Sequence, residues 1–247
     1  KNMNRGYYTA AQAMINQQRI LDAISNNVSN VNTAGYRKDE IVTNTFQEEL
    51  YLVNSRTETS GTSYQTYVDT SKTNLEQGSL EYTGSRYDIA IYGNVYFNIK
   101  HENGNVYQTR NGQFELDDEG YLILGRSGRV QGLNGDIYLG SDDFEINDLG
   151  QIITDEGVVD NLLLTYIPVN ANVDKFGENL YTYLGEETLP EGETFTIIQG
   201  AFEKSNVDSV KEMTQAMEAQ RMYEASSKIL QYFDTLNRRS AQEIAQI

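Results

Sequence analysis

The side chains that could carry out chemistry are few in this sequence and lie far apart. Nucleophilic catalysis through Ser or Cys needs a general base, and the sequence contains one histidine, His101, and no cysteine. His101 opens the run His101-Glu102-Asn103-Gly104, and a polar run that ends in Asn-Gly is typical of a hairpin tip. We therefore expect no catalytic role for His101. A metal site built from thiolates or from several imidazoles is excluded.

Two acidic clusters, Asp117-Asp118-Glu119 and Asp142-Asp143, are the remaining candidates, because calcium loops and glycosidases both use convergent carboxylates. Neither cluster has the alternating Asp spacing and distal Glu of an EF-hand loop, so solvated hairpin turns explain them better. No nucleophile elbow, phosphate-binding loop or dinucleotide-binding Gly pattern occurs. The sequence thus predicts a protein that is not an enzyme and needs no metal and no cofactor.

The composition narrows the class of protein further. The chain has 247 residues, of which 38% are hydrophobic, and it carries a formal net charge of -17. This acidity repels phosphate backbones, so we expect no nucleic acid as a partner. The longest apolar runs fall far short of the roughly 20 residues that span a bilayer, and the N-terminus lacks a continuous apolar stretch followed by a cleavage site. We therefore expect neither direct membrane insertion nor a cleaved signal peptide.

A long helix is expected at the start of the chain, from about residue 4 to 31. Alternate steps of three and four residues along it give mostly apolar positions, which is the pattern of a coiled-coil seam. The positions of this seam are Tyr7, Ala10, Met14, Gln17, Leu21, Ile24, Val28 and Val31.

A second long helix is expected at the end of the chain, from about residue 206 to at least 237, with Ser205 or Asn206 as its N-cap. It carries two adjacent apolar stripes, and two stripes require more than one packing partner. The first stripe contains Met213, Ala216, Ala219, Tyr223, Ser226, Leu230 and Phe233. The second contains Met222, Ala225, Ile229, Tyr232 and Leu236.

Between the helices, apolar and polar residues alternate in short runs that end in turn dipeptides such as Asn103-Gly104 and Glu191-Gly192. The run from Phe114 to Leu122 recurs from Phe144 to Ile152, so the same hairpin pattern is used twice. We expect an antiparallel, all-β middle domain over residues 80–204. An extended connector should precede it over 36–79, with at most one strand near 63–68. With helical segments at 1–35 and 205–247, the predicted fold class is α+β.

The end of the first helix is unusually rich in asparagine, with Asn26, Asn27, Asn30 and Asn32 in quick succession. Asn is costly inside a helix because its amide competes for backbone hydrogen bonds. One explanation is that the helix frays toward Gly35, whose tolerance of positive φ suits the residue past a helix end. The other is that these amides bond to neighbouring helices and set their register.

The same segment resembles a motif of the bacterial flagellar rod and hook axial proteins. Members of that family typically carry Asn-Asn-(Leu/Ile)-Ala-Asn-Val-Asn-Thr-Pro-Gly-(Phe/Tyr)-(Lys/Arg) after a short helix. Residues 26–37 match this phrase, with Val28, Ser29 and Ala34 as departures. The loss of Pro at Ala34 leaves the chain reversal less rigid but keeps the Gly.

Three further matches follow in the order of the family. Residues 88–97 resemble Asp-(Val/Ile)-Ala-Ile-x-Gly-x-Gly-Phe-Phe, with Val95 in place of the second Gly. Residues 107–122 resemble Tyr-Thr-Arg-(Asn/Asp)-Gly-x-Phe-x-(Leu/Val)-Asp-x-x-Gly-x-Leu, with Gln108 inserted. Residues 205–225 contain the Ser-Asn-Val-Asp and Ala-Gln-Arg-Met-Tyr-Glu-Ala phrases of the C-terminus.

This resemblance implies a structural subunit of the flagellar rod, the drive shaft that transmits torque from motor to hook. The terminal helices would pair in the inner coiled-coil layer of a helical tube, with the β domain outside. The partners would be further copies of the chain, neighbouring rod and hook proteins, and the type III export apparatus of the flagellum. The protein would be located in the flagellar basal body of the cell envelope, and it would be exported there without a cleaved signal peptide. The similarity at residues 26–37, 177–181 and 205–225 favours the distal-rod type.

The resemblance and the seams together give the expected subunit-interface residues. In the first helix and the reversal they are Tyr7, Met14, Leu21, Ile24, Asn26, Asn27, Val28, Asn30, Val31, Asn32 and Gly35. In the second helix and its approach they are Asn206, Val207, Met213, Met217, Tyr223, Leu230 and Phe233. The alternative, suggested by the many tyrosines and carboxylates, is an extracellular adhesive or carbohydrate-active β domain with coiled-coil oligomerisation arms.

Overall fold

The computed structural model describes residues 3–45, 66–155, 157–177, 179–183, 185 and 194–244. The chain forms two compact units. The first, which we call the helical unit, consists of residues 1–29, 39–72 and 208–247. The second, the β unit, consists of residues 30–38 and 73–207. The expected α+β class is confirmed.

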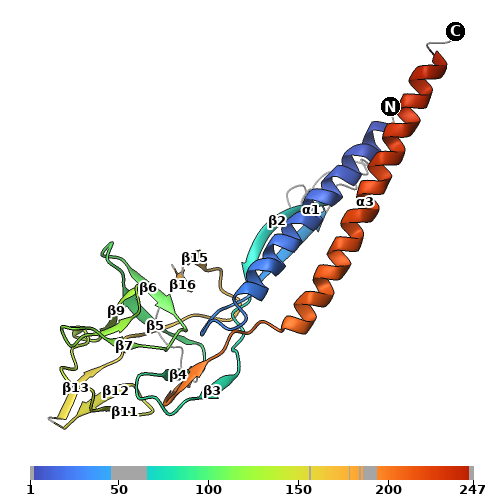
Figure 1. Ribbon diagram of the computed structural model, residues 1–247. Coiled ribbons are helices and arrows are strands. Elements are labelled where there is room, and N and C mark those ends of the chain that lie inside the picture. The colour runs from blue at the N-terminus through green and yellow to red at the C-terminus, as the bar shows by residue number, and fades with distance from the viewer. Residues whose placement is uncertain are drawn as a thin grey trace. The chain divides into compact units, whose positions relative to one another are not determined.

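The helical unit is built on two long helices, α1 (Met3–Ser29) and α3 (Ser209–Ile244), which pack side by side (Figure 1). Both lie close to their expected bounds. The N-cap of α3 differs from the expected Ser205 or Asn206. It is Asp208, whose Oδ1 accepts hydrogen bonds from the backbone N of Val210 and Lys211 at 3.0 and 3.2 Å. A short carboxylate at this position satisfies free N–H groups of the first turn.

The expected connector contains more structure than the sequence indicated. Two strands, β1 (Asp39–Thr45) and β2 (Thr66–Thr73), pair as a two-stranded sheet, and β1 packs against α1. The expectation of at most one strand near residues 63–68 is corrected for this reason, although residues 63–65 of that range lie outside the described part. The Thr-rich composition of both strands hid them, because their faces lack a clear apolar alternation.

The β unit is antiparallel in every strand pair that its described residues form. The largest sheet has the order β15 (Asp174–Phe176), β16 (Leu180–Thr182), β6 (Val106–Thr109), β5 (Val95–Lys100), β9 (Gly128–Gly132), β8 (Leu122–Leu124) and β7 (Glu115–Leu116), with β10 (Gly135–Asp136) on β9 and β14 (Leu164–Tyr166) on β5. A second sheet contains β11 (Phe144–Ile146), β12 (Gln151–Thr154) and β13 (Gly157–Asn161). The β unit also contains two separate two-stranded sheets. In one, β4 (Ile89–Tyr92) pairs with β17 (Thr196–Gln199), and in the other, β3 (Leu80–Tyr82) pairs with β18 (Ala201–Glu203).

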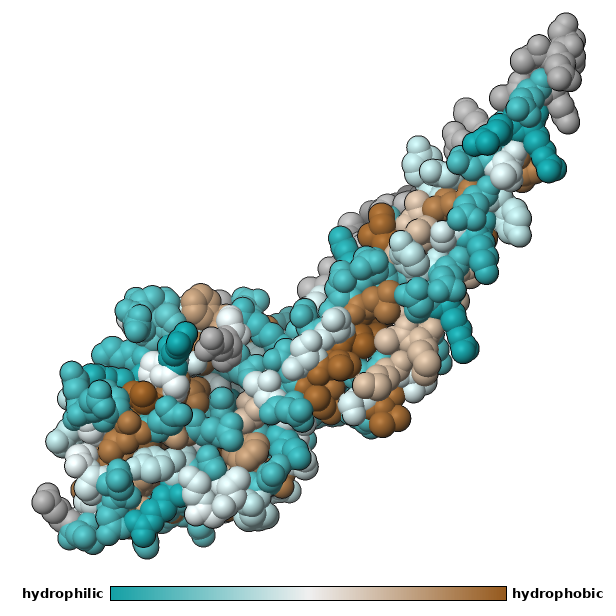
Figure 2. Space-filling view, in the orientation of Figure 1, coloured by the Kyte–Doolittle hydropathy of each residue, from teal (hydrophilic) through white to brown (hydrophobic). Residues whose placement is uncertain are grey.

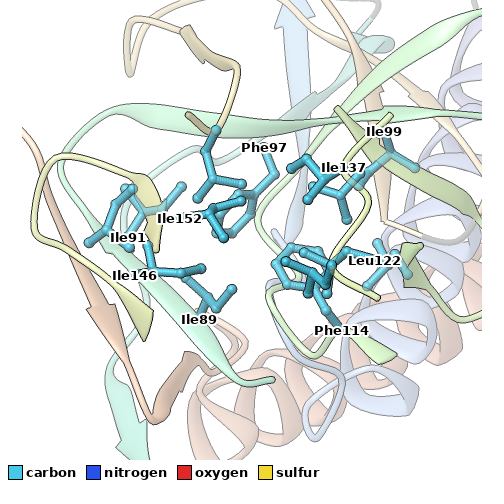
Figure 3. Close-up of a cluster of buried hydrophobic side chains, with 14 of the residues drawn as sticks. Ile89, Ile91, Phe97, Ile99, Phe114, Leu122, Ile137, Ile146 and Ile152 are labelled. Carbon is cyan, nitrogen blue, oxygen red and sulfur yellow. The ribbon is translucent and has the colours of Figure 1, made fainter. Parts of the chain in front are cut away.

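The core of the β unit lies among these sheets, where side chains from many strands converge (Figure 3). Ile89, Ile99, Leu122, Val130 and Ile152 are 0% exposed. Phe97 and Phe114 meet edge to face, with ring centroids 5.0 Å apart. Each fully buried aliphatic side chain contributes about 1.5 to 3 kcal/mol of hydrophobic stabilisation, so this cluster is the main source of the stability of the unit.

The repeated sequence pattern is also repeated in structure. Asp117 and Asn147 occupy equivalent positions in the turns of the β7–β8 and β11–β12 hairpins. Asp117 Oδ1 accepts hydrogen bonds from the backbone N of Glu119 and Tyr121 at 2.6 and 3.2 Å. Asn147 Oδ1 accepts the corresponding bonds from Leu149 and Gln151 at 3.1 and 2.9 Å. The acidic cluster at residues 117–119 is therefore turn chemistry, as its sequence context predicted.

Candidate functional site

The two helices of the helical unit pack against each other, and several residues of both expected seams are buried or half-buried. On α1, Ala10 and Ile24 are buried, and Met14, Leu21 and Val28 are half-buried. On α3, Ala219 is buried and Tyr223, Leu230 and Phe233 are half-buried. Gly6 contributes in a way that the sequence did not suggest, because a Cβ at this position would lie 2.8 Å from Cζ of Phe233. A glycine here lets a bulky ring pack directly on the α1 backbone.

The seam on α3 begins differently from the expected stripe. Met213 heads the first expected stripe, but it is 56% exposed and does not share the buried side of Ala219. Glu212 takes that inward position and is 4% exposed. The shift follows from helical geometry, since adjacent residues are about 100° apart around the axis.

Apolar side chains also remain exposed on both helices, and Figure 2 shows them gathered on the visible face. We call the exposed groups on α3 the methionine patch (Val210, Met213 and Met217) and the mid-helix patch (Met222, Ile229, Tyr232 and Leu236), with exposed fractions between 46% and 73%. Tyr7, Tyr8 and Ile15 of α1 are 42%, 65% and 49% exposed. By helical geometry the methionine patch lies nearly opposite the buried side of α3 and the mid-helix patch lies on one flank of that side, so α1 covers neither. Contiguous exposed apolar surface of this kind marks an interaction site.

The asparagine-rich end of α1 has a defined role at Asn27, which is 2% exposed. Its Nδ2 donates to the backbone O of Asp39 at 2.9 Å and to Glu212 Oε2 at 3.2 Å, and its Oδ1 accepts from Asp39 N at 2.9 Å. One amide thus joins the last turn of α1, the start of β1 and the first turn of α3. Asn26 is exposed, so the two neighbouring amides have different environments.

We predict that Asn27→Ala lowers the free energy of unfolding of the helical unit by about 2 kcal/mol, because it removes three hydrogen bonds in a buried site that includes a carboxylate. Thermal unfolding followed by circular dichroism at the helix band measures this loss. Asn26→Ala is the matched control and should change stability by less than about 0.5 kcal/mol. Equal effects of the two substitutions would contradict the role given to Asn27.

The reversal after α1, residues 30–38, is part of the β unit and packs closely against it. Gly35 has a φ of +66°, and a Cβ built on it would lie 2.3 Å from the backbone N of Asn111. Its own N donates to the backbone O of Glu203 at 2.7 Å. Gly35 is therefore required by both conformation and close packing within the chain. Asn179, itself at a φ of 59°, donates from Nδ2 to the backbone O of Ala34 at 3.3 Å.

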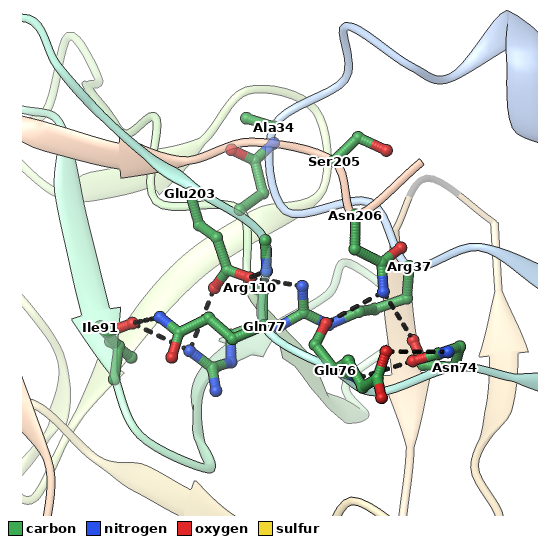
Figure 4. A network of polar contacts seen from close by, with 12 residues as sticks. Ala34, Arg37, Asn74, Glu76, Gln77, Ile91, Arg110, Glu203, Ser205 and Asn206 are labelled. Carbon is green, nitrogen blue, oxygen red and sulfur yellow. Dashed lines mark hydrogen bonds and ion pairs between the residues drawn. The ribbon is translucent and has the colours of Figure 1, made fainter. Parts of the chain in front are cut away.

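Asn206, near the C-terminal end of the β unit's second segment, is hydrogen-bonded to the same reversal. Its Oδ1 accepts from Lys38 N at 2.8 Å, and its Nδ2 donates to the backbone O of Asn74 and of Glu76 at 3.0 and 2.9 Å (Figure 4). A side chain that satisfies three separate backbone groups holds the segments that carry them at fixed distances. Val207, the next residue, is 8% exposed.

Behind the reversal lies a buried ion cluster that consists of Arg37, Glu203 and Arg110 (Figure 4). Their side chains are 0%, 1% and 2% exposed. Arg37 Nη1 donates to Glu203 Oε1, and Arg110 Nη1 donates to Glu203 Oε2 at 3.1 Å. Arg110 also donates to the backbone O of Ile91 at 3.1 Å and to that of Gly93, and its guanidinium lies 4.6 Å from the ring centre of Tyr96.

The two guanidiniums respond differently to this environment. Burial lowers the pKa of each, and the Glu203 carboxylate raises it. For Arg37 the carboxylate prevails and the pKa is raised. For Arg110 the positive charge of Arg37 adds to the effect of burial, and the pKa is lowered. Both remain cationic near neutral pH, because the ordinary pKa of arginine lies far above neutrality. The cluster therefore holds two buried cations on one carboxylate.

The structure places the expected interface residues in different environments. Ile24, Asn27, Gly35, Asn206 and Val207 are committed to contacts within their own unit, Asn30 and Val31 are half-buried, and Asn32 is exposed. Tyr7, Met213 and Met217 are the members with large exposed apolar surface. Sequence reasoning missed Gly6, Arg110, Glu203 and Glu212 as structural residues. Glu203 could have been recognised, because it directly follows the apolar residues Ala201 and Phe202 of strand β18. A carboxylate buried at such a position is costly unless a cation pairs with it.

Within the described part of the chain, no three His, Cys, Asp or Glu side chains are grouped as they would be to hold a metal ion. Neither helix in the same residues combines the length and apolar character that crossing a bilayer requires.

Three family models match successive parts of the chain. The model described as flagella basal body rod protein matches residues 8–37, and the model for the D1 domain of flagellar hook protein FlgE/F/G matches residues 90–177. The model for the C-terminal part of flagellar basal body rod FlgEFG protein matches residues 198–243. The first includes the asparagine-rich reversal, the second includes Arg110, and the third includes Glu203 and most of α3.

Whole-length relatives point to the same family. The flagellar basal-body rod protein FlgG of Bacillus subtilis is 32% identical over 95% of this chain and 97% of its own. FlgG of Borreliella burgdorferi is 28% identical over 95% of this chain and 96% of its own. The flagellar basal-body rod protein FlgF of Caulobacter vibrioides is 27% identical over 99% of this chain and 100% of its own. With the order of the three matched segments and the nearly complete coverage, the chain belongs to the family of flagellar basal-body rod proteins.

Proposed function

We propose that the chain is a structural subunit of the flagellar rod that assembles with copies of itself into a helical tube, in contact with other rod and hook proteins of the basal body. The observation that carries this proposal is the pair of exposed apolar patches on α3, which face away from α1. A helix that has one apolar side covered by its own chain and two others uncovered is suited to contact more than one neighbour.

The tube would be held by a coiled-coil layer in which α1 and α3 of one subunit pack against the helices of the next. Repeated heterologous contact between identical subunits generates a helical filament rather than a closed ring when the rotation does not close. The interface would contain Tyr7 of α1 together with the methionine and mid-helix patches of α3. Seam residues such as Leu21 and Phe233 would contribute by holding the two helices in the paired arrangement.

Several finer parts of the proposal rest on the family resemblance. The subunit would be exported by the flagellar type III apparatus without a cleaved signal peptide, and it would occupy the distal part of the rod and transmit torque to the hook. It would act without catalysis. The relatives reported above are all named as flagellar proteins, which favours a rod subunit over the alternative of an adhesive or carbohydrate-active domain.

Electron microscopy of the purified full chain tests the proposal. Tubes or rods with a helical repeat are the expected product at high protein concentration. Discrete small oligomers of defined size would favour the adhesive alternative, and persistent monomers under all conditions would contradict self-assembly.

We further predict that added salt speeds up this assembly. The net charge of the chain is -17, and the excess of acidic groups lies in residues 39–204, so subunits repel one another at low ionic strength. Salt at 0.1 M screens exposed charges beyond about 10 Å. Light scattering over time at several salt concentrations measures the rate. Because screening depends on ionic strength, sodium chloride and sodium gluconate should accelerate assembly alike, and slower assembly with either salt would count against the prediction.

A further inference from the structure

Within the described residues, one edge of the Arg37 guanidinium in the buried ion cluster makes no hydrogen bond. Arg37 uses Nη1 to bond Glu203, whereas its Nε and Nη2 are buried and have no hydrogen-bond partner in the described structure. Nε and Nη2 lie side by side on the guanidinium, and together they form the fork of donors that grips a carboxylate or another anion. Arg110 Nε is a third buried donor without a partner.

The Glu203 carboxylate is engaged elsewhere, by three hydrogen bonds. Its Oε1 accepts from Arg37 Nη1 and from the backbone N of Gly78 at 2.7 Å, and its Oε2 accepts from Arg110 at 3.1 Å. A further cation lies close by, because Lys175 Nζ donates to the backbone O of Arg37 at 2.7 Å and lies 4.6 Å from the ring centre of Tyr36. Within the cluster itself two guanidiniums share one carboxylate, so its positive charge exceeds its negative charge, in a protein whose net charge is -17.

Buried donors in native proteins are satisfied by protein groups, by ordered water or by an ion. Water would satisfy the hydrogen bonds of the Arg37 fork but would leave the uncompensated charge, which is the more costly defect in a buried site. We propose that the Nε and Nη2 edge of Arg37 binds a small monovalent anion of the halide class, with chloride as the physiological occupant. The ion is small because Arg37 is 0% exposed, and monovalent because the cluster has one cation more than it has carboxylates.

Chloride bound there stabilises the β unit and leaves its surface unchanged. A ligand that binds only the folded state at ten times its dissociation constant raises the folding equilibrium constant about elevenfold. The thermal unfolding midpoint of the full chain should therefore be higher in sodium chloride than in sodium gluconate of the same ionic strength, because gluconate is too large for a closed site. Bromide should replace chloride in this effect.

Arg37→Lys separates the proposal from general salt effects. Lysine keeps a cation for Glu203 but loses the fork, so the difference between chloride and gluconate should disappear. Arg86→Lys is the matched control, because Arg86 pairs with Asp143 on the surface and both are more than half exposed. That variant should keep the full chloride effect.

A second measurement remains informative if Arg37→Lys does not fold. The linewidth of the chloride-35 nuclear resonance should broaden on addition of the wild-type chain, and excess bromide should reverse the broadening. Equal midpoints in the two salts, together with no broadening, would mean that the fork holds water only and would overturn the proposal. The inference does not depend on rod assembly, since it concerns the monomer.

Discussion

Glu203→Gln is expected to lower the free energy of unfolding of the β unit by about 3 to 5 kcal/mol, the cost of leaving buried charges without their partner. The substitution keeps the size of the side chain but removes the carboxylate that pairs with both Arg37 and Arg110. It also weakens the bond to the segment before β3, because Glu203 Oε1 accepts from the backbone N of Gly78 as well. A loss of this size should shift the midpoint of thermal unfolding by on the order of 10 °C.

Tyrosine fluorescence during chemical denaturation gives the measurement, since the chain has no tryptophan and Tyr96 and Tyr181 are buried in the β unit. Glu81→Gln provides the control on the neighbouring strand β3. Glu81 pairs with Lys204 at 2.9 Å, but both side chains are about half exposed, so its loss should cost less than about 1 kcal/mol. If Glu203→Gln were as mild as Glu81→Gln, the ion cluster would not be a major element of stability.

The second large effect is expected on assembly and not on folding. Met217→Asp should abolish tube formation, because burial of a large apolar side chain contributes roughly 1.5 to 3 kcal/mol and an unpaired carboxylate in the contact adds several more. Every subunit carries the same defect, so it recurs at each contact along the tube. A loss of about 3 kcal/mol or more raises the concentration needed for assembly by at least about 100-fold.

Sedimentation of assembled material at increasing protein concentration measures this threshold, with circular dichroism as the test of folding. Gln231→Asp is the matched control, because it places the same charge at an exposed polar position of the same helix. It should assemble like the wild type, and the Met217 variant should keep its helical content as a monomer. Normal assembly by Met217→Asp would remove the methionine patch from the interface.

The parts of the fold that follow from local sequence were predictable. The seam of α1 was visible because its side chains repeat at helical spacing, and the two matching hairpins were visible because Asp117 and Asn147 fix their turns through bonds to residues two and four positions later. The N-cap was misplaced by two or three residues because Ser205, Asn206 and Asp208 are all good capping residues. Only packing decides among such neighbours.

The long-range contacts were not predictable in the same way. The cluster of Arg37, Arg110 and Glu203 joins residues far apart in the chain, and each of them reads in isolation as a surface charge. Asn27 shows a subtler case. The sequence offered fraying or contact with neighbouring helices as explanations. The amide bonds Glu212 of the neighbouring helix α3, as the second explanation expects, and it also bonds the backbone of Asp39, which neither explanation included. Periodicity shows which face of a helix is inside, but not which polar groups meet there.

The account depends most on whether the patches of α3 are buried between subunits, and the absence of cysteine allows a direct test. Met217→Cys and Ile229→Cys each place one thiol in a patch, and Arg126→Cys places one in an exposed turn of the β unit. The rate of maleimide labelling is then compared between monomers and assembled tubes. We expect both patch thiols to react readily in the monomer and to be protected in the tube, with the Arg126 position reactive in both. Patch thiols that react equally fast before and after assembly would contradict the account.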